Sequence, residues 1–392
     1  MEKKYIQSLE ETAEYFKFMI KSNPHRNSLE ATLSAMNGKS RKNPVFYLGY
    51  INNPDDKTTG EDALILQKIK IKNPKEQDLA NEIIQLLAPL KMLNPITPAL
   101  DLGRGTGTLI PSFGIPLNPR LNDAPSYTLT LDQILSLPEP DPAISGLMSE
   151  IHEKIDFIKS KISIKDGIYI HLPDMQGPFN IAHMIGGEDV LSGPYIDPEK
   201  FHRVMDKITN FWISAEKMLR QWIGSEWLYP VEKQTVRIAE CSTNLVSRNI
   251  YEKFILPYDL KIANYAEQMN LPLNIHTCSG PHVFHETMDN IPNILFTEAG
   301  FIKNAVAGWT PIDEALKTIN DRPIVLNIGQ EIYNTENPET IIKKDFDLYE
   351  KNHHLLFGYT LMEWKTKDKS KICNLHRKMD EYWLEKGGLN LI

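Results

Sequence analysis

A histidine and a cysteine separated by one residue form the pair best suited to chemistry in this sequence. They are His276 and Cys278, in the run LPLNIHTCSG. In an extended segment, residues i and i+2 project to the same side, so the imidazole and the thiolate can converge on one metal ion. Glu298 follows 20 residues after Cys278, in NILFTEAG, and is a third ligand of a kind that zinc accepts. The three residues predict a zinc site. The alternative is a core histidine and an inert buried cysteine.

Other polar side chains stand where predicted strands end, on the face where barrel enzymes carry out their chemistry. We predict catalytic roles for Asp174, Glu240 and Tyr359, and substrate-binding roles for Gln176, Asn327 and Gln330. For each residue the alternative is that it caps a loop or bonds to turn backbone.

Eight short runs, rich in β-branched and aromatic residues and bounded by Pro, Gly, Asn or Asp, predict the strands that position these residues. The runs begin at Pro44, Pro98, Gly167, Thr235, Leu271, Asn293, Arg322 and His354. Segments of helical period cover residues 28–37, 77–90, 143–162, 198–223, 248–269, 281–290, 311–319, 338–351 and 371–386. This alternation predicts right-handed βαβ units and a parallel sheet, and eight strands are the number that closes a barrel.

The predicted fold class is therefore α/β, a (β/α)₈ TIM barrel. We expect one domain over residues 1–392, with an N-terminal helical extension at residues 1–40. Residues 50–75 and 103–142 are rich in turn-forming residues and predict long loops over the barrel mouth.

Composition excludes several classes of protein. The 43 Lys and Arg residues against 51 Asp and Glu give a net charge of −8 without long runs of one sign, which argues against nucleic-acid binding. No apolar stretch approaches the roughly 20 residues that cross a bilayer, so we expect no membrane contact. Three cysteines in a long chain favour a reducing compartment, and we predict a cytoplasmic enzyme.

The run PALDLGRGTGTL imitates the glycine loop of S-adenosylmethionine-dependent methyltransferases. That loop needs a helix directly after it, whose N-terminus meets the ligand. Here Pro111 and Pro116 forbid a helix of useful length. We predict a glycine-rich loop at the barrel mouth, with Asp101 and Arg104 as possible substrate contacts.

Three runs taken in order, NSLEATLSAMNGKSRKNPVFYLG, DMQGPFNIAHMIGGEDVLSGPYIDPEKFHRVMDKITNF and IAECSTNLVSRNIYEKFILPYDLKIANYA, resemble the uroporphyrinogen decarboxylase superfamily. The IHTCSG run and NIPNILFTEAG follow in the family's order, and the resemblance covers most of residues 28–390. It implies a (β/α)₈ barrel whose mouth binds the substrate.

Within the superfamily, the chain looks most like the zinc-dependent, corrinoid-linked methyltransferases. The decarboxylases have an N-terminal arginine-rich segment that grips the substrate's carboxylates, whereas residues 44–52 read PVFYLGYIN. His276 and Cys278 match the first two zinc ligands of the methyltransferases. A later Gly-Cys pair of that branch is replaced by Gly358-Tyr359, and Cys241 is a candidate for the missing sulfur. Cobalamin-independent methionine synthases also use His-x-Cys, a Glu and a distal Cys.

The resemblance implies a zinc enzyme that moves a methyl group between a small-molecule donor or thiol acceptor and a corrinoid (cobalamin). The corrinoid would be carried by a separate partner protein. Two other functions remain open at this point. One is a metal-independent decarboxylase or lyase in which a carboxylate such as Asp174 or Glu240 steers protons. The other is a non-catalytic barrel that binds a corrinoid or tetrapyrrole.

Overall fold

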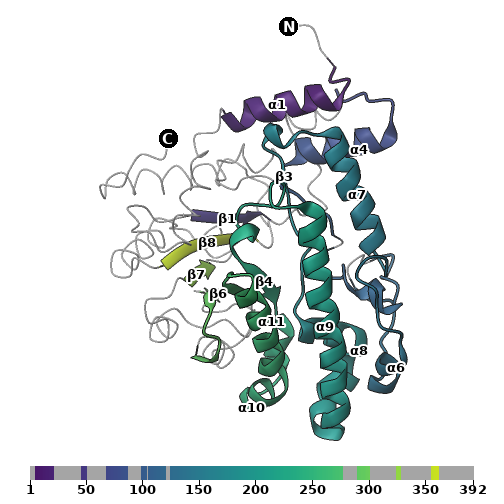
Figure 1. Cartoon of the computed structure of the whole chain (residues 1–392), viewed down its shortest axis with the longest axis vertical. Helices are drawn as coiled ribbons and strands as arrows, with labels where there is room; N and C mark the ends of the chain where they lie inside the picture. Colours follow the sequence, from purple (N-terminus) through teal and green to yellow (C-terminus); the bar gives the residue numbers. More distant parts are fainter. Residues whose placement is uncertain are drawn as a thin grey trace, which may run out of the picture.

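The architecture is described from a computed structural model (Figure 1). With side chains, the structure describes residues 5–21, 68–86, 99–103, 105–120, 124–276 and 289–294. For residues 46–50, 295–300, 324–327 and 355–361 it describes the backbone. The helices predicted at 28–37, 311–319, 338–351 and 371–386 lie outside these residues, as do most of the one at 281–290 and most of the 50–75 excursion.

Eight parallel strands form at the eight predicted runs, which confirms the strand prediction. They are β1 (Phe46–Tyr50), β2 (Ala99–Leu100), β3 (Tyr169–Ile170), β4 (Val236–Ala239), β5 (Leu273–His276), β6 (Ile294–Gly300), β7 (Ile324–Asn327) and β8 (Leu355–Leu361). Six pair in the order β1-β8-β7-β6-β5-β4, and β2 pairs with β3.

A single parallel bridge between Gln176 and Ala239 joins the chain after β3 to β4. The strands therefore follow one another in the cyclic order that a barrel requires. No pairing joins β1 to β2 within the described residues. The fold shown is thus a parallel α/β fold with barrel-like strand order.

One described helix, α1, precedes β1, and the other described helices lie between strands. The longer ones are α1 (Leu9–Lys21), α4 (Pro74–Gln85), α7 (Met148–Lys161), α8 (Pro178–Ile196), α9 (Pro198–Ile223) and α11 (Leu256–Gln268). Shorter ones are α6 (Leu131–Ser136), α10 (Arg248–Ile250) and the 3₁₀ turns η1 (Ile110–Phe113), η2 (Ile164–Asp166), η3 (Glu232–Gln234) and η4 (Cys241–Leu245). A π-helical turn at Tyr251–Ile255 joins α10 to α11. No described helix is both long and apolar enough to cross a bilayer.

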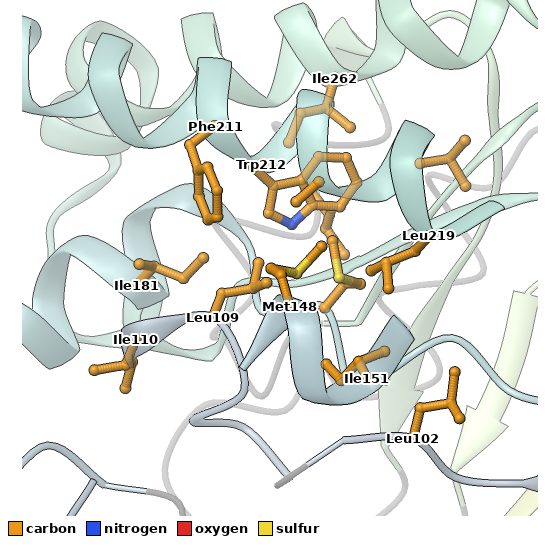
Figure 2. Packing of buried hydrophobic residues seen from close by; sticks show 14 of the residues in the cluster. Leu102, Leu109, Ile110, Met148, Ile151, Ile181, Phe211, Trp212, Leu219 and Ile262 are labelled. Carbon is orange, nitrogen blue, oxygen red and sulfur yellow. The ribbon is translucent and has the colours of Figure 1, made fainter. Parts of the chain in front are cut away.

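Helix α9 has the predicted bounds because both its ends carry strong signals. Pro198 occupies its first turn, and the Asp197 carboxylate accepts the Lys200 N–H at 3.0 Å. Gly224 follows its last residue with a φ of +73°, which favours glycine. The helix buries a continuous apolar stripe, and Figure 2 shows Trp212 from this stripe surrounded by Leu109, Met148, Ile181 and Leu219.

Helix α8 was not predicted, because its sequence contains Gly186, Gly187, Gly193 and Pro194. Gly187 adopts φ +53° and ψ −130°, which breaks the segment into two helical pieces. The segment is helical because burial outweighs propensity: Phe179, Ile181, Ala182 and Ile185 are fully buried. The helix therefore forms through contact with its neighbours, chiefly α9.

The glycine loop after β2 takes the form that its prolines predict. Gly105 has a φ of +58°, and the segment continues into η1, a turn of four residues, rather than a long helix. Asp101 is exposed, and its carboxylate accepts the Gly103 N–H at 2.9 Å. Arg104 lies outside the described residues. This loop therefore lacks the extended helix N-terminus on which a nucleotide would be held.

We predict that S-adenosylmethionine does not bind this protein. The reason is that the 3₁₀ turn at Ile110–Phe113 offers too few aligned backbone N–H groups to hold the ligand. Calorimetric titration of the ligand into the full chain should give no saturable heat. Micromolar binding that Gly105→Val removes would contradict the prediction.

Candidate functional site

His276, the last residue of β5, stands at the edge of the sheet where the carboxyl ends of the strands meet. Its backbone carbonyl accepts the Glu240 N–H at 2.8 Å, and its side chain is partly buried. Ile275 pairs with Thr297 on β6, so one further step of the same register places position 298 beside His276. This register brings the backbone of the two predicted ligand positions side by side, although Glu298 lies within β6, two residues before the strand ends at Gly300.

The remaining predicted ligand, Cys278, lies outside the described residues, and for Glu298 the structure describes the backbone. Among the side chains that are described, no three His, Cys, Asp or Glu residues gather as a metal site. The donor set itself fits zinc, since imidazole, thiolate and carboxylate are its usual ligands. The metal assignment stays a prediction.

The predicted residues on β7 and β8 are placed by register. Asn327 is the partner of Gly358, and Tyr359 is the partner of Leu48 on β1. Gln330 lies outside the described residues. The assignments of Asn327, Gln330 and Tyr359 to substrate and catalysis stay predictions.

Glu240 follows β4 and is buried against the first turn of α8. One carboxylate oxygen accepts the Phe179 N–H and the other the Asn180 N–H, each at 3.2 Å. These are N–H groups that a helix leaves unpaired at its N-terminus. The carboxylate therefore fixes the start of α8 to the end of β4. This contact gives Glu240 a positioning role, while its catalytic role stays a prediction.

The close approach of Glu240 depends on Gly177. A Cβ at position 177 would lie 2.1 Å from Oε1 of Glu240, and the Gly177 N–H donates to the Ala239 carbonyl at 2.7 Å. The Gly177 backbone cannot move away without losing its hydrogen bond to Ala239, and the Glu240 carboxylate cannot move away without losing those from α8. Glycine is required here by the space between two strand ends, and not by its φ.

Gly177→Ala should destabilise the protein by about 1–3 kcal/mol, because the new methyl group overpacks this contact. Urea unfolding should show a lower midpoint with an unchanged slope. Lys217→Ala, on the exposed side of α9, is the control and should stay within about 0.5 kcal/mol. An unchanged midpoint for the glycine variant would show that the Glu240 contact is dispensable.

The sequence analysis missed a second buried carboxylate, Asp259 on α11. It has no exposed surface, and its Oδ2 accepts the Tyr251 hydroxyl at 2.8 Å. Its Oδ1 has no hydrogen-bond partner within the described part of the chain. Burial raises the pKa of Asp259 to about 7, against the weaker opposing effect of the Tyr251 hydrogen bond.

Glu240 and Asp259 interact as two buried carboxyl groups. Burial, with the nearby Asp259, raises the pKa of Glu240 well above its ordinary value, although the two α8 N–H groups oppose this. Those N–H groups and the helix dipole favour a charged Glu240. We therefore assign the proton that the pair retains at neutral pH to Asp259.

A second missed residue, Asn180 in the first turn of α8, connects the segments after β3 and β4. Its amide nitrogen donates to Oε1 of Gln176, and its amide oxygen accepts the Ser242 N–H, both at 2.6 Å. The Gln176 carbonyl in turn accepts the Trp212 indole N–H at 3.0 Å. Gln176, predicted to bind substrate, is thus buried and held by its neighbours.

Asp174, the other predicted residue after β3, is partly exposed. Its carboxylate pairs with the Arg237 guanidinium at 3.4 Å, with exposed side-chain fractions of 35% for Asp174 and 41% for Arg237. Arg237 lies in the middle of β4, where sequence reasoning attached no role to it. A charged residue between the fully buried Val236 and Ile238 was the available signal.

A parallel α/β fold with polar groups at the carboxyl ends of its strands is the arrangement of barrel enzymes. The family model described as uroporphyrinogen decarboxylase (URO-D) matches residues 108–296. Over this segment, just under half of its length, the chain is similar to the uroporphyrinogen decarboxylase family that its sequence motifs predicted.

The similar proteins are methyltransferases. A methylated-thiol–coenzyme M methyltransferase of Methanosarcina mazei is 25% identical over 138 residues, which are 35% of this chain and 32% of the relative. The matched segment thus spans about a third of that relative's length. A solved structure of a methyltransferase from Methanosarcina mazei shares the fold with a TM-score of 0.61 and 14% identity, over 90% of this chain and 98% of the other.

Proposed function

We propose that this protein is a methyltransferase that uses a zinc ion held by His276, Cys278 and Glu298. The methyl group would move between a small-molecule donor or thiol acceptor and a corrinoid (cobalamin) carried by a separate protein. The observation that supports the proposal is the pairing of β5 with β6, in which Ile275 lies opposite Thr297, one residue before His276 and Glu298. The similarity to methyltransferases supports the reaction class.

Zinc, when bound, would deprotonate a coordinated thiol at neutral pH and so make it a nucleophile. This chain's own residues would supply the rest of the site. Glu240 and Asn180 hold the segments after β3 and β4 in one position. Asp174, after β3, and its ion-pair partner Arg237, within β4, would offer charges of both signs to the substrate.

We further propose that the sheet closes between β1 and β2 into a (β/α)₈ barrel, within one domain that spans residues 1–392. The order of all eight strands supports closure, since β2 and β1 are the two ends of that order. Residues 1–40 would form an extension of this domain, of which α1 packs on α4. The cytoplasm is the location that we propose.

The competing function is a metal-independent decarboxylase or lyase. The URO-D description of the family model and the partly exposed carboxylate of Asp174 favour it. The two functions differ in their need for zinc and in their product.

The test uses methylcobalamin as the methyl donor and a series of small thiols as acceptors. We expect the full chain, loaded with zinc, to consume methylcobalamin in a thiol-dependent reaction that yields the methyl thioether. Removing zinc with a chelator should stop the reaction, and adding zinc should restore it. A protein that binds no zinc and transfers no methyl group to any thiol would refute the proposal in favour of a lyase.

A further inference from the structure

The two faces of the sheet differ in polarity around β4 and β5. Val236 and Ile238 on β4, and Leu273 and Ile275 on β5, are fully buried members of the hydrophobic core. Helix α11 packs on β5, and Figure 1 shows it next to β4. Because side chains alternate along a strand, the residues between them face the opposite side, here called the inner face.

The inner face of β4 and β5 carries polar residues at its centre. Arg237 on β4 pairs in register with Asn274 on β5, and Ala239 pairs with His276. Barrel interiors are ordinarily filled by branched apolar side chains in layers. An arginine and an asparagine in their place indicate a surface that meets a polar ligand.

Asn274 supplies an independent indication of a ligand. Its side chain is 5% exposed, and its amide oxygen has no hydrogen-bond partner within the described residues. A buried acceptor without a donor costs about 1–3 kcal/mol. A ligand with an N–H or O–H group beside Arg237 would remove that cost.

Arg237, the register partner of Asn274, and the ion-pair partner of Arg237, Asp174, carry charges of both signs. The Arg237 guanidinium and the Asp174 carboxylate are 3.4 Å apart, longer than the roughly 2.7–2.9 Å of a strong charged hydrogen bond. Both side chains are more than a third exposed, so water reaches them. A ligand with its own carboxylate and ammonium can replace this water and pair with both.

We infer that Arg237, Asp174 and Asn274 bind the zwitterionic head group of an α-amino acid substrate. The carboxylate would pair with Arg237, and the ammonium would donate to Asp174 and to the amide oxygen of Asn274. His276 is two residues beyond Asn274 on β5, which at about 3.3 Å per residue is about 7 Å. A sulfur on a short side chain reaches from the head group to the strand end. The inference rests on the proposed methyl transfer, for which it names the substrate class.

The test measures the binding of three thioethers to the full chain by calorimetry, with no corrinoid present. S-Methyl-L-cysteine carries both charges, 3-(methylthio)propionate the carboxylate alone, and 2-(methylthio)ethylamine the ammonium alone. We expect the zwitterion to bind at least about tenfold more tightly than either of the others, because it alone makes both ion pairs.

Variants assign each charge. Arg237→Gln should lower the affinity for S-methyl-L-cysteine to that of the amine, and Asp174→Asn should lower it to that of the propionate. Arg248→Gln, which removes an exposed arginine paired with Glu252, is the control and should bind normally. Thermal unfolding of each variant shows whether it is folded, and Asp174→Asn, at a partly exposed side chain, still tests the inference if Arg237→Gln unfolds.

Equal binding of the zwitterion and the propionate would overturn the inference and leave a simple anion site. Binding of none of the three would overturn it as well. These results are independent of the proposed function, which fails only if methyl transfer from methylcobalamin to thiols is absent.

Discussion

His276→Ala should reduce the zinc content of the purified protein from about one ion per chain to nearly none, and methyl transfer should be lost with it. The imidazole is the one predicted ligand whose side chain lies in the described structure, at the end of β5. Loss of a residue that only orients a metal ligand lowers metal affinity about 10–100-fold. Loss of the ligand itself should lower the affinity further. Zinc is measured by mass spectrometry after purification without added metal.

A second histidine provides the control for this variant. His152 on α7 stacks on Trp222 at 4.2 Å between ring centroids and belongs to no strand end. His152→Ala should retain zinc and activity. Equal zinc in wild type and His276→Ala would end the metal assignment and favour the lyase.

Asp259→Asn should stabilise the protein progressively as the pH rises from 5 to 8. The folded-state pKa of Asp259 is about 7, against an ordinary value of 3.8, because burial disfavours the charged form. The wild type therefore loses folding stability as the pH rises from the ordinary pKa of 3.8 to the folded-state pKa of about 7, because over this range the unfolded chain releases the proton that the buried carboxyl group still holds. Three pKa units correspond to roughly 4 kcal/mol. The amide of the variant stays neutral at every pH.

Chemical denaturation of both proteins at pH 5, 6, 7 and 8 measures this difference. Glu240→Gln is the paired variant, and we expect it to lose stability at every pH, because an amide NH₂ cannot accept an N–H of α8. A constant difference between Asp259→Asn and wild type across the range would refute the assignment of the proton to Asp259.

The strands could be predicted because each is a short apolar run between residues that end strands. Leu273, Ile275 and their neighbours are buried by the sheet itself, so local sequence carries the signal. Helix α8 could not be predicted, since its glycines and Pro194 oppose a helix and distant contacts stabilise it. Short helix α6 was missed within the predicted 103–142 loop, although Thr130 and Gln133 form a capping box there.

The candidate site was predictable where it depends on strand ends and not where it depends on packing. Asp174, Gln176 and Glu240 all lie at the predicted edge. Asp259 was missed because it lies within a helix and not at a strand end. Its burial could nevertheless have been predicted from the helical spacing of its neighbours. Ile255, Ile262 and Ala266 form a buried stripe at helical spacing, and Asp259 lies on that stripe. Arg237 was missed because only the pairing of β4 with β5 shows what lies beside it.

The pairing of the first strand with the last has a consequence for how the chain folds during synthesis. Phe46 on β1 pairs with Phe357 on β8, 311 residues later. At about 5–20 residues per second, the ribosome needs on the order of 15–60 s to make that partner. Throughout this interval β1 has emerged without the strand that flanks it, and an unpaired strand edge is a template for aggregation. Nascent chains whose synthesis stops before β8 is made should therefore depend on chaperones. The middle of the chain can already bury its own apolar residues at that stage.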